Sequence, residues 1–225
     1  MRQQPRAHFE YNLSEVQRAL LQLGSAVEQA IVQAMRALQR NDTSAARRIM
    51  RADDNIDERR ADVEDRVLTI VAAQQPLATD LRFLLSVVRI ADDLERMGDY
   101  AEGIAALVLR AVDEPAMDLP PELEAMTEHV QPMLHTSVEA FVARDAGAVE
   151  QLEAADDQID ELNRTLQASM VRHIQNVPQQ AARALYYLFV GHNLERIADR
   201  TVNIAERTAF IATGMQREHR RVPRS

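Results

Sequence analysis

The chain repeats itself once, and this duplication restricts its possible folds more than any other feature. The heptapeptide Ala52–Glu58 (ADDNIDE) returns as ADDQIDE at Ala155–Glu161, with six of seven residues identical. The hexapeptide Leu94–Asp99 (LERMGD) returns as LERIAD at Leu194–Asp199. Both matches occur in the same order, at shifts of 103 and 100 residues, so we infer that the sequence consists of two copies of one unit.

A short segment rich in proline and acidic residues separates the two copies. Residues 113–122 hold three prolines and four acids, a composition typical of a connection between folded units. We therefore expect a first unit at 8–112, a linker at 113–122 and a second unit at 123–214. The Arg-rich residues 215–225 are expected to form a basic, solvated tail.

Each copy contains three long segments with the apolar spacing of an α-helix. In the first segment of the chain, apolar residues recur at three- and four-residue steps: Val16, Leu20, Leu23, Val27, Ile31, Met35 and Leu38. The second segments show the seven-residue spacing of helices packed along their length, at Ile49, Ile56, Val63 and Ile70 and at Leu152, Ile159, Leu166 and His173. Asn41–Ser44 supplies turn and N-cap chemistry, and Pro76 and Pro178 are suited to helix starts. We predict an all-α fold of two tandem three-helix bundles, with six long helices in total.

The composition supports this fold and excludes several classes of function. Aromatic residues make up only 4% of the chain and glycine occurs six times, which argues against β-sandwiches and barrels. A net charge of −9 argues against nucleic acid as a partner. The absence of cysteine excludes disulfides, Cys-ligated zinc and thiol catalysis. No apolar run reaches the roughly 20 residues of a membrane span, and the first residues lack a signal-peptide core, so we expect a cytoplasmic protein.

Acidic residues recur at four-residue spacing in the best-matching parts of the two copies. The pairs are Asp53/Asp57, Glu95/Asp99, Asp156/Asp160 and Glu195/Asp199. A helix places both members of each pair on one face, where like charges repel, so an ordinary surface would intersperse Arg. Two such carboxylates can converge on one cation, and oxygen ligands suit Mg, Mn, Ca or Fe. Solvated or partner-facing acids are the alternative interpretation.

The third segments extend these pairs into longer rows. Asp92, Glu95, Asp99 and Glu102 fall within an arc of about 80° on a helix. In the second copy the same arc holds His192, Glu195, Asp199 and Glu206. His192 therefore stands where the first copy has Asp92, and Ala182 stands where it has Asp80. We expect the two copies to differ in metal, occupancy or partner.

The duplicated motifs resemble those of the PhoU family. The similar residues are Ala73–Pro76 (AQQP) and Asp93–Asp99 (DLERMGD) in the first copy, and Asn193–Asp199 (NLERIAD) in the second. The resemblance covers about residues 9–214 and implies two tandem three-helix units. It also implies a regulator of phosphate uptake and signalling rather than an enzyme.

Further expectations follow from that resemblance. Such a regulator restrains the phosphate-starvation response by linking the ATPase subunit of a phosphate ABC transporter to a membrane sensor histidine kinase. It is expected to be a homodimer and to reach the membrane only through its partners. The resemblance implies bound metal ions, and the ligands it points to are Asp53, Asp57, Glu95, Asp99, Asp156, Asp160, Glu195 and Asp199. His192 is added as a candidate ligand because it lies in the same arc as Glu195 and Asp199, and the candidate ions are iron, zinc, manganese and magnesium.

Two other functions remain open from the sequence. A di-iron carboxylate oxidase also gathers acids and Glu-x-x-His pairs inside a helical bundle. Here the pair His192-x-x-Glu195 runs in the opposite order, and each unit supplies three helices rather than four. The other possibility is a metal-free scaffold whose acids only solubilise it.

Overall fold

The computed structural model describes residues 4–215, and every regular element in that range is helical. Its helices are α1 (Gln4–Arg40), α2 (Thr43–Gln74), α3 (Ala78–Arg110), α4 (Pro121–Ala143), α5 (Ala148–Asn176), a 3₁₀ turn η1 (Pro178–Gln180) and α6 (Ala181–Thr213). The predicted all-α class with six long helices is thereby confirmed. Of the basic tail expected at 215–225, all but Met215 lies outside the described residues. No helix within residues 4–215 is long and apolar enough to cross a membrane.

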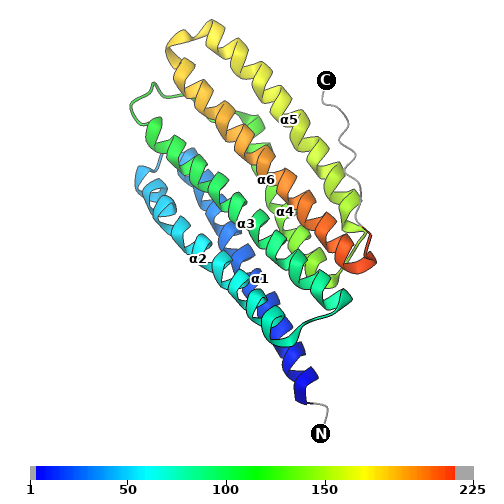
Figure 1. Cartoon of the computed structure of the whole chain (residues 1–225). Coiled ribbons are helices and arrows are strands. Elements are labelled where there is room, and N and C mark those ends of the chain that lie inside the picture. Colours follow the sequence, from blue (N-terminus) through cyan, green and yellow to red (C-terminus); the bar gives the residue numbers. More distant parts are fainter. Residues whose placement is uncertain (1–3, 216–225) are drawn as a thin grey trace.

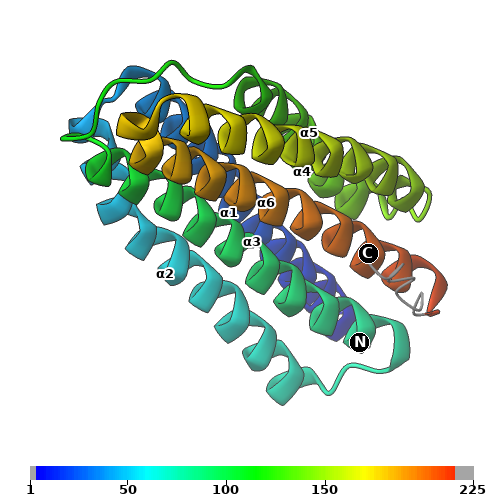
Figure 2. The ribbon, with the colours of Figure 1, turned by 90° about the horizontal axis from the view of Figure 1, so that it is seen from above.

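The two copies form two three-helix bundles that share one interface. Helices α1, α2 and α3 pack on one another, as do α4, α5 and α6. In Figures 1 and 2, α3 and α6 lie side by side in the middle, with α2 beyond α3 and α5 beyond α6. Helices α3 and α6 run antiparallel, because Asp93 contacts Arg200 while Tyr100 contacts Arg196. The predicted pair of bundles is confirmed.

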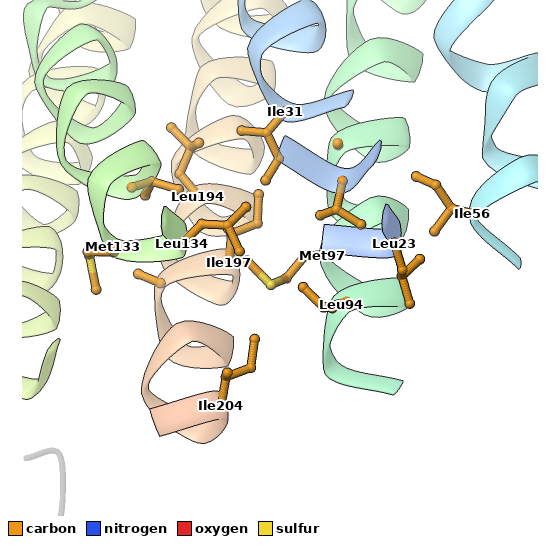
Figure 3. Close-up of a cluster of buried hydrophobic side chains, with 14 of the residues drawn as sticks. Leu23, Ile31, Ile56, Leu94, Met97, Met133, Leu134, Leu194, Ile197 and Ile204 are labelled. Atoms are coloured by element: carbon orange, nitrogen blue, oxygen red, sulfur yellow. The ribbon is translucent and has the colours of Figure 1, made fainter. Parts of the chain in front are cut away.

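The apolar positions named from the sequence form the core. All seven residues of the first segment, from Val16 to Leu38, are buried. The α2 heptad is buried too, as are Leu152, Ile159 and Leu166 on α5. His173 ends the α5 heptad half-buried, and its Nε2 lies 2.6 Å from Oε1 of Gln180. Figure 3 shows apolar side chains of both bundles meeting in this core.

The turns follow the expected helix-end chemistry. The Asp42 side chain caps α2 by accepting a hydrogen bond from the Ala45 N–H at 2.9 Å. Pro76 precedes α3, whose N-cap Leu77 is extended, so the helix begins two residues after the proline. Pro178 starts the 3₁₀ turn that leads into α6.

A buried arginine fixes the connection between the two bundles. The helices leave residues 111–120 between α3 and α4. Arg183, 5% exposed at the start of α6, donates hydrogen bonds to the backbone oxygens of Ala111, Glu114 and Pro115. It also donates to Oδ1 of Asn41, at the end of α1. A single guanidinium therefore satisfies four oxygens from two separate segments and ties the linker to both bundles.

Replacing that guanidinium should destabilise the whole chain. Arg183→Met leaves the three linker carbonyls short of a donor, and we expect a loss of about 3 kcal/mol in the free energy of unfolding. Tyr187→Phe is the comparison, because it removes the hydrogen bonds of the Tyr187 hydroxyl to the Met117 oxygen and to Arg183 but leaves the bonds of Arg183 to the linker carbonyls in place, with an expected loss of about 1 kcal/mol. Urea unfolding monitored by circular dichroism measures both. Equal losses for the two variants would contradict the role given to Arg183.

Candidate metal centre

Three carboxylates of the first copy converge between α2 and α3. Asp53, Asp57 and Asp99 each place one oxygen within 4.8 Å of the others, and we call them the α2–α3 cluster. Asp53 and Asp57 are one helical turn apart on α2, while Asp99 comes from α3. No other group of three or more potential metal ligands within residues 4–215 meets the same spacing.

A glycine brings the two helices close enough for this convergence. Gly98, the residue before Asp99, faces α2, and a Cβ atom there would lie 3.0 Å from Cδ1 of Ile56 and 3.6 Å from Oδ1 of Asp53. The buried Ile56 sits between the two α2 acids in sequence and anchors that stretch of α2 against α3. The small residue therefore positions the α2 acids beside Asp99.

The α2–α3 cluster carries negative charge that the nearby Arg96 compensates only in part. Burial, with the charges of Glu102 and Asp99 next in importance, raises the pKa of Asp53 to about 6. Burial and the neighbouring Asp57 raise the pKa of Asp99, and burial raises that of Glu95. Within residues 4–215, none of the three cluster carboxylates forms a hydrogen bond or a salt bridge. Crowded acids of this kind are stabilised by a proton or a cation.

The corresponding acids of the second copy are arranged differently. Asp156, Asp160, Glu195 and Asp199, which we call the α5–α6 set, are half-buried. Nη1 of Arg196 lies 2.9 Å from Oδ2 of Asp199, and Nδ2 of the buried Asn163 donates to Oε2 of Glu195 at 2.6 Å. Side chains of the same bundle thus hold Glu195 and Asp199.

The interface between α3 and α6 adds a polar network beside both groups of acids. Asp93 is only 7% exposed and accepts a hydrogen bond from Nη1 of Arg200 at 3.1 Å. Burial raises the pKa of Asp93, and the hydrogen bond and charge of Arg200 offset part of that rise. Burial acts to raise the pKa of Tyr100, but the hydrogen bonds and charges of Arg196 and Arg200 outweigh it and lower that pKa.

Both copies match one family model. The PhoU domain model matches residues 20–108 and again 123–208, which is most of the chain and both duplicated units. The chain belongs to the PhoU family. The resemblance inferred from its motifs is thereby confirmed.

Relatives and solved structures of the PhoU family match nearly the whole chain. A protein of Clostridium acetobutylicum named phosphate-specific transport system accessory protein PhoU homolog is 34% identical and aligns over 92% of this chain and 95% of its own length. A Synechocystis protein of the same name is 30% identical, with 93% of each chain covered. The crystal structure of the phosphate transport system regulatory protein PhoU from Streptococcus pneumoniae superposes with a TM-score of 0.87 at 28% identity, covering 93% of this chain and 99% of that one. PhoU from Pseudomonas aeruginosa superposes with a TM-score of 0.86 at 28% identity, covering 92% and 100%.

The structure brings some of the nine candidate ligands of this PhoU-family chain together and keeps others apart. It brings Asp53, Asp57 and Asp99 together and leaves Glu95 half-buried beside them. It does not bring the four acids of the α5–α6 set to the same spacing, and His192 is exposed on α6. Glu102 belonged to the predicted acidic row but was not among the candidate ligands, although its charge raises the pKa of Asp53.

The pKa of Asp53 predicts a pH dependence of stability. Because its folded pKa of about 6 exceeds its ordinary value of 3.8, the folded chain binds this proton more tightly than the unfolded chain. The contribution of Asp53 to stability is therefore present at low pH and is lost as the pH rises through 3.8 towards about 6. With chelator present, Asp53→Asn should be more stable than wild type at about pH 7 and equally stable near about pH 4.

Urea unfolding at several pH values measures this difference. Asp65→Asn is the control, because Asp65 is exposed and lies three turns further along α2. It should leave the pH profile unchanged. An Asp53→Asn profile parallel to that of wild type across the range would show that Asp53 does not carry the effect.

Proposed function

We propose that this chain is an accessory regulator of phosphate uptake that acts by binding rather than by catalysis. The observation that carries the proposal is the match of both duplicated units, over more than nine-tenths of the chain, to proteins named as phosphate-specific transport accessory proteins. The two crystal structures that match it are likewise of PhoU proteins, one of them titled a phosphate transport system regulatory protein.

The proposed partners are the ATPase subunit of a phosphate ABC transporter and a phosphate-sensing histidine kinase. Through them the chain, as a homodimer in the cytoplasm, would restrain the phosphate-starvation response. An acidic chain of net charge −9 supports binding to basic partner surfaces, because complementary charge speeds encounter and selects the partner.

The α2–α3 cluster is the proposed metal site. Its donors are oxygens only, which are the ligands of Mg, Mn and Fe, whereas zinc in proteins prefers nitrogen and sulfur. The crowding that raises the pKa of Asp53 is relieved when a cation binds, so the residues present suit such an ion. Glu95 and Glu102 lie close enough for their charges to act on Asp53 and would add to the attraction. A bound cation would neutralise the charge of these carboxylates and link α2 to α3.

Metal binding at this cluster can be measured directly. The double variant Asp57→Asn/Asp99→Asn removes two of the three ligand charges, and we expect at least about a tenfold loss of Mn²⁺ affinity in isothermal titration of the full chain. The variant Asp62→Asn/Asp65→Asn is the control, because it removes the same total charge from two exposed positions of α2 that lie outside the cluster. Equal weakening by both variants would mean that Mn²⁺ responds to overall charge and would contradict the site.

The regulatory role is tested in cells. Deleting the gene in phosphate-rich medium should raise a phosphate-starvation reporter to the level of phosphate-limited cells, because the proposed restraint is lost. Reintroducing the wild-type chain should lower the reporter again. A reporter that stays low after deletion would contradict the proposed function, whatever the chain binds in solution.

A further inference from the structure

The duplication places two arginines at the same motif position, yet their surroundings differ. Arg96 and Arg196 both follow the glutamate of the LER motif. Arg196 forms a salt bridge with Asp199 at 2.9 Å and hydrogen-bonds to Tyr100 of the other bundle. Arg96 is exposed and forms no ion pair within residues 4–215, although its charge reaches Asp99.

The repeat correspondence explains why only one arginine is held. At the shift of 100 residues between the copies, Tyr100 corresponds to Arg200 and Arg196 corresponds to Arg96. The equivalent of the contact between Tyr100 and Arg196 would therefore bring two arginines together. A phenol can accept a hydrogen bond from a guanidinium, whereas two guanidinium groups repel and neither can accept. Arg200 pairs with Asp93 instead, and the residue that corresponds to Asp93 is the uncharged Asn193.

Consequently the two groups of acids differ in the interactions that a metal ion would have to replace. In the α5–α6 set, Arg196 already neutralises part of the charge on Asp199, and Asn163 engages Glu195. An incoming cation has to displace both before those oxygens can turn to it. In the α2–α3 cluster no ion pair of Asp53, Asp57 or Asp99 to a described residue has to be broken.

We propose that Arg196 competes with divalent metal for the carboxylates of the α5–α6 set. This competition lowers the metal affinity of the α5–α6 set below that of the α2–α3 cluster. Tyr100 positions the Arg196 side chain from across the α3–α6 interface, so a residue of the first bundle contributes to the metal affinity of the second. The inference rests on the proposed metal-binding function and adds to it that the two groups of acids bind metal unequally and that Arg196 contributes to the difference.

The test titrates Mn²⁺ into full chains that keep only one group of acids. Asp156→Asn/Asp160→Asn leaves the α2–α3 cluster, and Asp53→Asn/Asp57→Asn leaves the α5–α6 set. We expect Arg196→Met, added to the second of these chains, to tighten Mn²⁺ binding about fivefold, the worth of one partly buried ion pair. Arg196→Gln should do the same if the Met variant does not fold, and circular dichroism reports folding.

The matched control is Arg96→Met in the chain that keeps the α2–α3 cluster. It removes the same charge from the same motif position, and we expect a change below about twofold, because within residues 4–215 Arg96 forms no ion pair and acts on Asp99 only through its charge. Equal tightening by both substitutions would overturn the inference, because net charge alone would then explain it. No tightening by Arg196→Met or Arg196→Gln would also overturn it. If the chain that keeps the α2–α3 cluster binds no Mn²⁺, the metal part of the proposed function fails with it.

Discussion

The structure depends on the antiparallel packing of α3 against α6. Each of these helices is the third of its own bundle, and their shared interface turns two duplicated units into one body. A salt bridge between the buried Asp93 and the half-buried Arg200 lies inside this contact, beside the hydrogen bonds of Tyr100. Burying two charges is costly unless they are paired, so this interface tolerates only alignments that keep the pair together. That alignment leaves the other side of each helix to face α2 or α5 (Figures 1 and 2), and the acids described above come from these two helix pairs.

Much of the fold could be predicted because it rests on local spacing. The apolar periodicity of the first segment and the α2 heptad identified buried faces, and the paired motifs identified the duplication. The four-residue acid spacing also pointed to Asp53, Asp57 and Asp99. The remaining features depend on neighbours that are distant in sequence. Nothing local marks Arg183 as the residue that holds the linker, and only the folded interface shows that Tyr100 meets Arg196.

Divergence between the copies explains how one motif yields two different arrangements of acids. The first copy has Arg60 at the position that corresponds to Asn163. Arg60 forms a salt bridge with Asp92 at 3.0 Å rather than with an acid of the α2–α3 cluster. In the second copy His192 replaces Asp92, and the shorter, uncharged Asn163 engages Glu195. The motif residues are retained while their partners have changed. A di-iron oxidase finds no support in this arrangement, because the histidine it would require is exposed on α6 and lies outside the α2–α3 cluster.

The central claim is that oxygens of Asp53, Asp57 and Asp99 hold a cation between α2 and α3. Anomalous diffraction from crystals of the full chain grown with Mn²⁺ tests this most directly, because it locates the ion without reference to affinity. We predict an anomalous peak within about 2.5 Å of an oxygen of each of these three residues. A Mn²⁺ peak elsewhere and none at these three carboxylates would contradict the account. So would the absence of any bound Mn²⁺ at saturating concentration.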